Sequence, residues 1–271
     1  MKLKPLFIAA TSLLLATQAS AHNRWLLPSH FNLSNDKGEW IMVDVTASNE
    51  TFFVDKPMGA ERMVITGPDG KRVRAGSLYK GHRKSVVDLQ LTQSGTYQLQ
   101  LAGTPSYFTR YEVKGEEKPK FMRNVNKQQR DARLPKDAIN VETLEGYSNV
   151  LSFVTLNSPS VSFPLSKQGL ELIPVTHPSD IAQGEPVEFK FAFNGEVKAG
   201  VNVEIIREGV RYRNDPEALE LTSDKNGAIK FTPKQAGRYL LMADYQQDVS
   251  DYALADKVGG RVFLTFEAVL D

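Results

Sequence analysis

The chain has 271 residues, no cysteine and a formal net charge of +1, with 33 Lys and Arg against 32 Asp and Glu. The absence of cysteine excludes disulfides and thiolate metal sites, so the fold must be stabilised by ordinary burial of a hydrophobic core. The balanced charge argues against nucleic acid as a partner, because phosphate binding needs a concentrated basic surface.

The N-terminus has the three zones of a cleavable signal peptide. Two lysines precede an apolar run over residues 6–16, and Ala19-Ser20-Ala21 supplies the small residues of a cleavage site. The run is shorter than the roughly 20 apolar residues that cross a bilayer, and no later segment is apolar enough to span one. We therefore expect residues 1–21 to be removed and the mature chain, a periplasmic protein without a transmembrane segment, to begin at His22.

Short runs of β-type residues separated by turn residues fill the first half of the mature chain. Strands are predicted over residues 40–47, 62–67, 85–91 and 96–102. Gly67-Pro68-Asp69-Gly70 is a tight-turn sequence, since Gly accepts a positive φ and Pro presets its own. This spacing indicates a β-sandwich rather than a parallel sheet with crossover helices.

Residues 114–149 differ from the rest because they are charged, rich in Lys, Arg, Glu and Asn, and poor in β-branched residues. A structureless stretch of this length is unusual in a compact domain, so a helix is expected over residues 121–132. The basic side chains of the segment are interpreted as a solvated face that nearby acids balance.

The second half repeats the β-type pattern. Strands are predicted over residues 170–174, 187–193, 201–206, 227–232, 239–245 and 261–268. The predicted fold is therefore all-β, with two immunoglobulin-like or transthyretin-like β-sandwich modules and a charged, partly helical insertion. We place the N-terminal domain at 22–164, including the charged segment 114–149, and the C-terminal domain at 165–271.

Each predicted module contains a strand end, a Gly turn and then a Tyr on the returning strand. The two instances are Gly95-Thr-Tyr97 and Gly237-Arg-Tyr239. In sandwich folds a Tyr at this place can tie a corner through its hydroxyl group. Because Gly-x-Tyr is also common after turns, both interpretations stay open.

His22 is the most informative residue for function, because cleavage before it would join a free α-amine and an imidazole in one residue. Both lone pairs become available at small cost near neutral pH, so the residue can chelate a metal ion. With one or two further imidazoles such a site suits Ni, Co, Cu or Zn. The alternative is an incidental residue at a frayed terminus.

The other three histidines are His30, His82 and His177, and none is paired at metal-ligand spacing. Any site must therefore be assembled by the fold. We predict His177 and His82 as partners of His22, because both lie at turns that could reach the first strand. His30 is only eight residues from His22 and is expected to face solvent.

Catalytic motifs are missing from the sequence. There is no Cys nucleophile, no Gly-x-Ser-x-Gly, no His-Glu-x-x-His and no phosphate-binding Gly-rich loop. The paired Glu116-Glu117 has no apolar flank that would raise a carboxyl pKa. Asp180 and Glu185 could add an oxygen ligand to a metal, although both are better explained as turn and surface acids. We predict that the protein is not an enzyme.

The mature start, Ala21-His22-Asn23-Arg24-Trp25-Leu26-Leu27-Pro28, resembles the Ala-His-x-x-Trp-Leu-x-Pro opening of bacterial periplasmic proteins described as components of cobalt and nickel uptake. Much of that family is known only as a domain of unknown function. Further matching blocks lie at residues 170–178, 184–186, 193–201, 224–227 and 236–239. In this order the blocks span the mature chain.

The resemblance implies a periplasmic protein that binds nickel or cobalt, with copper or zinc as other possible ions, and delivers it to an inner-membrane metal importer. His22 is the one ligand that it carries over. The sequence departs from a dedicated metal carrier in that its four His and six Met are scattered singly.

Two other functions stay open. The first is a non-metal binding or adhesion module of the periplasm, whose aromatic side chains would stack on sugars. The candidate aromatic residues are Tyr107, Phe108, Tyr111, Tyr147, Tyr212 and Tyr252. The second is a copper-binding protein that uses the same N-terminal His.

Overall fold

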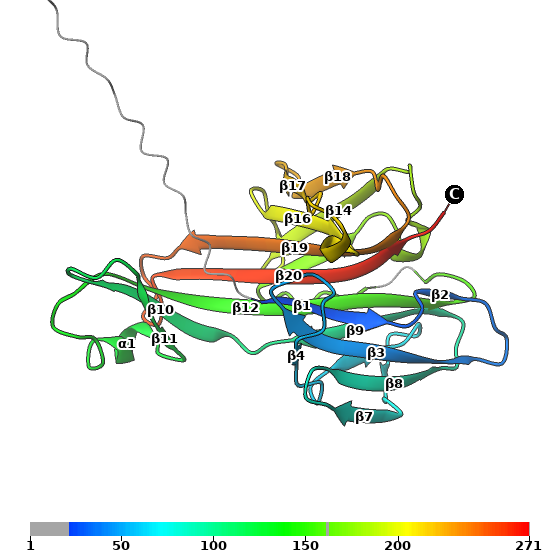
Figure 1. Ribbon diagram of the computed structural model, residues 1–271, viewed down its shortest axis with the longest axis horizontal. Coiled ribbons are helices and arrows are strands. Elements are labelled where there is room, and N and C mark those ends of the chain that lie inside the picture. Colours follow the sequence, from blue (N-terminus) through cyan, green and yellow to red (C-terminus); the bar gives the residue numbers. More distant parts are fainter. Residues whose placement is uncertain (1–21, 161–162, 271) are drawn as a thin grey trace, which may run out of the picture.

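The computed structural model describes residues 22–160 and 163–270, so the predicted signal peptide lies outside the described residues. Nearly all regular structure in the described part is β-strand, and this confirms the predicted fold class (Figure 1). The helical share of the charged insertion is small. No helix in the described part has the length and hydropathy of a membrane span.

The first twelve strands and the helix follow in chain order. They are β1 (Asn23–Pro28), β2 (Asn32–Leu33), β3 (Glu39–Ser48), β4 (Lys56–Pro57), β5 (Val64–Thr66), β6 (Arg72–Val73), β7 (Ser77–Lys80), β8 (Ser85–Leu91), β9 (Gly95–Ala102), β10 (Ser106–Val113), β11 (Lys120–Arg123), α1 (Lys127–Arg130) and β12 (Ala138–Leu156). The later elements are β13 (Leu170–Pro174), η1 (Pro178–Asp180), β14 (Val187–Phe193), β15 (Glu196–Val197), β16 (Asn202–Arg207), η2 (Val210–Tyr212), β17 (Leu219–Thr222), β18 (Ala228–Phe231), β19 (Gly237–Asp248) and β20 (Lys257–Ala268).

These strands form three sheets. The N-terminal sheet has the order β1-β3-β8-β7, with β4 also on β3, and the C-terminal sheet has the order β13-β14-β15, with β18 on β14. Between them lies a central sheet of order β17-β16-β19-β20-β12-β9-β5-β6, to which β2, β10 and β11 also belong. Figure 1 shows β19, β20 and β12 side by side across the middle of the molecule, with β3 and β8 below them and β14 above.

The central sheet is covered by a hydrophobic core on each face. Val150 and Val154 of β12 belong to the core with the N-terminal sheet, whereas Leu151 and Phe153 belong to the core with the C-terminal sheet. Successive side chains of a strand point to opposite faces, so the unbroken burial of residues 149–156 follows from cover on both sides.

The two predicted domains share this central sheet. β12 and β20, from opposite sides of the predicted boundary at residues 164 and 165, pair in parallel from Leu144 with Lys257 to Ser152 with Thr265. The boundary stays a prediction, and the two outer sheets fall on its two sides. The two hydrophobic cores are not separated by this boundary, because Phe263 of β20 packs in the core of the N-terminal sheet.

The charged segment contains β11 and the first part of β12, so the helix expected over residues 121–132 is wrong in extent. Phe121 pairs with Arg110 between β11 and β10, and its ring lies 5.0 Å from that of Phe108. The helix α1 has only four residues. The side chains of Asn126 and Gln129 form a capping box at its N-terminus. Tertiary pairing overrode the local helix propensity here.

The repeated Gly-x-Tyr pattern forms a tyrosine corner in both halves. Its two glycines have φ of +135° and +137°. The Tyr97 hydroxyl donates to the carbonyl oxygen of Gln93 at 3.1 Å, and the Tyr239 hydroxyl donates to that of Gln235 at 2.5 Å. Each hydroxyl thus ties its strand to the backbone four residues upstream, and the corner interpretation is confirmed.

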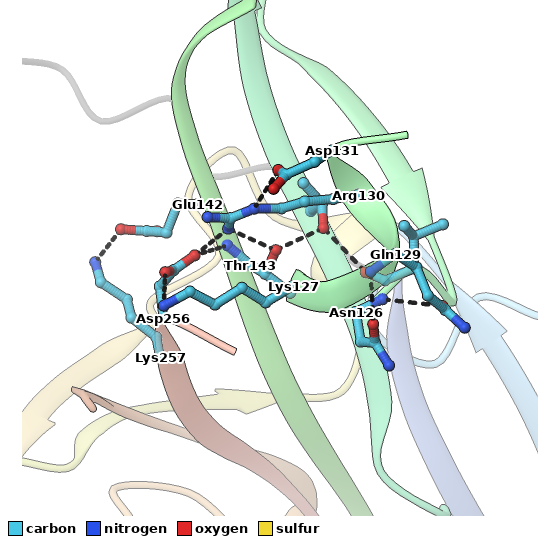
Figure 2. Close-up of polar contacts among 11 residues, drawn as sticks. Asn126, Lys127, Gln129, Arg130, Asp131, Glu142, Thr143, Asp256 and Lys257 are labelled. Atoms are coloured by element: carbon cyan, nitrogen blue, oxygen red, sulfur yellow. Dashed lines mark hydrogen bonds and ion pairs between the residues drawn. The ribbon is translucent and has the colours of Figure 1, made fainter. Parts of the chain in front are cut away.

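One carboxylate ties α1 to the central sheet (Figure 2). Asp256 accepts hydrogen bonds from Lys127 Nζ at 2.8 Å, from Arg130 Nη1 and from the backbone N–H of Thr143 at 2.8 Å. Burial by itself would raise the pKa of Asp256, but the hydrogen bonds from Lys127, Arg130 and Thr143 outweigh it and lower the pKa to about 2.

Replacing Asp256 by Asn is therefore expected to destabilise the protein by about 1–2 kcal/mol at neutral pH, because two cations lose their partner. The folded-state pKa lies below the unfolded value of 3.8, so this stability is present above about pH 4 and is lost as the pH falls toward 2. Urea unfolding followed by circular dichroism should show a large difference between wild type and variant at pH 7 and a small one near pH 2. Asp251→Asn, at an exposed carboxylate of the same loop, is the control. An equal difference at both pH values would contradict the assignment.

Candidate functional site

The start of the predicted mature chain is held firmly in the fold. β1 pairs with β3 from its first residue, Asn23, and the Asn23 side chain donates to Thr51 Oγ1 at 3.1 Å. Trp25 and Leu26 are fully buried, and the Trp25 ring packs edge-on against Phe52 with centroids 5.6 Å apart. The residue before β1 is therefore one peptide unit from an anchored strand, which argues against a frayed terminus.

His22 lines a cavity of about 400 Å³ at the edge of the N-terminal core. Its walls come from both sheets that enclose this core, with β1, β3 and β4 on one side and β9 and β12 on the other. The lining residues are His22, Arg24, Ala47, Lys56, Pro57, Met58, Gly59, Arg62, Leu101, Ala102, Gly103, Ser148 and Val150. A volume of this size suits a small molecule or a chelated ion.

Strand pairing brings two cations together beside His22. Arg24 and Lys56 are the partners of Ala47 on its two sides in the N-terminal sheet, so all three side chains share one face. Lys56 Nζ lies 2.8 Å from His22 Nε2. An ammonium group only donates, so Nε2 is the acceptor and the proton of the neutral ring is on Nδ1.

Positive charge extends beyond the cavity along the central sheet. Arg24 Nη1 donates to Ser148 Oγ at 3.0 Å. Burial, and then the charges of Arg261 and Arg123, lower the pKa of Arg24. Arg261 itself is paired with Asp244 at 2.8 Å. The guanidinium of Arg24 therefore lies where an additional negative charge would be stabilised.

His177 is part of a hydrogen-bond network at another place. Its Nε2 lies 3.0 Å from the carbonyl oxygen of Ser160 and 3.2 Å from Thr96 Oγ1. Its Nδ1 accepts from the backbone N–H of Ser179 at 3.1 Å, and the ring lies 5.5 Å from that of Phe163. Both ring nitrogens thus have protein partners, and the residue caps the short helix η1.

The structure does not bring the three predicted metal ligands into one cavity. Thr96, which contacts His177, precedes the cavity residue Leu101 by five positions in β9, a separation of about 17 Å along a strand. His82 is exposed in the turn between β7 and β8, and His30 is also exposed. Across residues 22–160 and 163–270, no group of three or more His, Cys, Asp or Glu side chains is arranged to hold a metal ion.

Three of the aromatic residues considered for sugar stacking surround one buried carboxylate instead. The Tyr107 hydroxyl donates to Glu145 Oε1 at 3.4 Å, and Glu145 is buried. A hydrogen bond to Glu145, together with burial, raises the pKa of Tyr252, and burial followed by the charge of Glu145 raises that of Tyr147. Tyr212, by contrast, is 86% exposed.

The sequence analysis named His22 as a candidate ligand but did not name Arg24, Lys56 and Arg62, which line the same cavity. Each is an isolated basic residue in the sequence, and no local motif marks it. The signal for Lys56 lies in the strand pairing, which places it across Ala47 from Arg24, and Arg62 follows in the connection between β4 and β5.

Comparisons with known proteins give one match to a family. The model described as "Domain of unknown function (DUF4198)" matches residues 19–247. No curated protein matches the chain.

Several solved structures are similar to the chain at low identity. The Yersinia pseudotuberculosis adhesin InvE has 10% identity and a TM-score of 0.23, over 90% of this chain and 58% of the adhesin chain. The D0-D1 domain of intimin has 13% identity and a TM-score of 0.20, over 89% and 96%. The elastase-activated alpha-2-macroglobulin of Escherichia coli has 9% identity and a TM-score of 0.23, over 92% of this chain and 31% of that one.

Proposed function

We propose that this chain, which belongs to the family described as "Domain of unknown function (DUF4198)", is a periplasmic protein that binds nickel or cobalt through its processed N-terminus. The observation that carries the proposal is the position of His22. The residue directly precedes an anchored strand, and its imidazole lines a cavity between two sheets. Neither His82 nor His177 lines this cavity, so the proposal depends on His22.

The chemistry follows from the two nitrogen donors of a processed His22. The α-amine and Nδ1 lie on one residue and close a chelate ring around a metal ion, which requires Lys56 to give up its contact with Nε2. Nitrogen ligands suit Ni²⁺, Co²⁺, Cu²⁺ and Zn²⁺. Copper is the alternative cargo, because Met58 also lines the cavity and its thioether is a soft ligand.

Delivery to an inner-membrane importer is the role that we propose for the bound metal. The support is the resemblance of the segment from Ala21 to Pro28 to the opening of cobalt and nickel uptake components. A non-metal binding or adhesion module is the alternative, and the exposed ring of Tyr212 favours it. A glycan or protein pulldown that succeeds with all metal chelated, and fails with Tyr212→Ala, would support that alternative.

The test compares the processed protein, beginning at His22, with a form that carries one extra alanine before His22. The extension converts the α-amine into an amide, which removes one of the two nitrogen donors. We expect calorimetric titration with Ni²⁺, Co²⁺, Cu²⁺ and Zn²⁺ to show a loss of about 100-fold or more in affinity for the preferred ion, since even outer partners of a ligand change metal affinity by about 10–100-fold.

The matched control is His30→Ala, which removes an exposed imidazole near β1 and should leave the affinity unchanged. Mass spectrometry of the exported product should find His22 as the first residue. Equal metal affinity of the processed and extended forms, or a different first residue, would contradict the proposed function.

A further inference from the structure

The cavity that holds His22 is positively charged. Arg24, Lys56 and Arg62 line it, and none of the described residues that line it is acidic. Glu61 lies against Gly59 but lines a different cavity. A free divalent cation bound at His22 would therefore share the cavity with three cationic side chains, which repel it.

The contact between Lys56 and His22 opposes a free ion in a second way. Lys56 Nζ donates to Nε2, so the neutral ring keeps its proton on Nδ1. When Nδ1 binds a metal, the proton must move to Nε2, and two donors then face each other at 2.8 Å. A free ion can bind only if Lys56 leaves, whereas a ligand that brings its own acceptor gives Lys56 a new partner.

The remaining groups fit such an acceptor. Arg24 and Arg62 both line the cavity, and the planar fork of a guanidinium group matches a carboxylate in a bidentate manner. The cavity of about 400 Å³ falls in the size range of small-molecule sites, and a bare ion would leave most of it to water.

We propose that this cavity takes the metal as its complex with a small polycarboxylate chelator, so that the substrate is an anionic chelate rather than the free ion. This inference rests on the proposed function, because it keeps the α-amine and Nδ1 of His22 as metal ligands. The carboxylates of the chelator bind Arg24, Lys56 and Arg62 and compensate their charge.

The experiment titrates the processed protein with Ni²⁺ alone, with nickel citrate, with citrate alone and with inorganic phosphate. We expect nickel citrate to bind about tenfold or more tightly than Ni²⁺ or citrate alone. A protein that takes only the free ion would give the opposite sign, because citrate competes for nickel and lowers its apparent affinity. Phosphate binding as tight as that of nickel citrate would overturn the carboxylate assignment.

Two substitutions separate the roles of the cations. Lys56→Gln should strengthen binding of Ni²⁺ alone, since it removes a charge and a competing donor, and should weaken binding of nickel citrate about tenfold. Arg62→Gln should weaken nickel citrate about tenfold as well. The control is Arg74→Gln, at an arginine that lines a different cavity, and it should change neither affinity. Equal effects of all three substitutions on nickel citrate would overturn the proposal.

The alanine-extended form distinguishes the two possible failures. If the extended and processed forms bind nickel citrate equally and Lys56→Gln weakens both, the cavity binds the anion and the proposed function of His22 is wrong. If the extension abolishes binding of Ni²⁺ but citrate lowers the nickel affinity of the processed form, His22 binds metal and the chelate inference is wrong.

Discussion

Replacing Trp25 by alanine is expected to lower the free energy of unfolding by about 3–5 kcal/mol, the usual cost of deleting a large aromatic side chain from a core. Trp25 is fully buried and belongs to the core beneath the N-terminal sheet. Because it lies three residues after His22, the same substitution loosens the strand that positions the proposed metal ligand. We expect metal affinity to fall together with stability.

Trp40→Ala is the matched control, because the chain has two tryptophans and Trp40 is 53% exposed. Its cost should stay below about 1 kcal/mol. Urea unfolding followed by far-ultraviolet circular dichroism measures both variants, and nickel titration of the folded Trp25→Ala protein measures the second effect. Similar losses of stability in the two variants would show that Trp25 is not the anchor of the N-terminus.

The second large effect is expected at Gly260, where β13 begins against the central sheet. A Cβ atom at this position would lie 2.7 Å from the backbone nitrogen of Leu170 and 2.8 Å from its Cβ. These atoms cannot turn away as the end of a flexible side chain can, so β13 must move as a unit. Gly260→Ala should therefore destabilise the protein by about 2–3 kcal/mol, which is typical of overpacking.

Gly146→Ala tests whether this cost comes from the close approach or from the strand environment. Gly146 lies in β12, next to β20, and the nearest atom to its Cβ would be the carbonyl oxygen of Ser106 at 3.9 Å. Its expected change is within about 0.5 kcal/mol. If urea unfolding gave both substitutions the same cost, the crowding at Leu170 would not be its cause.

Much of the β-structure could be predicted where at least one face of a strand is buried. β8, β13 and β14 begin and end at the predicted residues, and their alternating or continuous apolar runs reflect that burial. No strand was predicted over β12, whose residues 138–148 are only partly covered and show no alternation. The helix expected over residues 121–132 failed because Phe121 pairs with β10.

The site was predictable only where its chemistry is local to the sequence. His22 follows from the signal-peptide pattern and the chelating power of an N-terminal histidine, and it keeps its place as the candidate ligand. The cations beside it depend on the register of β3 with β1 and β4, which no local pattern shows. The hydrogen bonds of His177 with Thr96 and Ser160 likewise depend on tertiary packing, which no local pattern shows.

The parallel pairing of β12 with β20 cannot form until β20 has been synthesised. The Ser152 hydroxyl, for example, donates to the carbonyl oxygen of Thr265, 113 positions later. An emerging chain that has produced β12 but not β20 exposes apolar side chains on both faces of that strand and an unpaired edge. Contacts of such large sequence separation are formed slowly, so the exposure of β12 before β20 pairs with it favours aggregation.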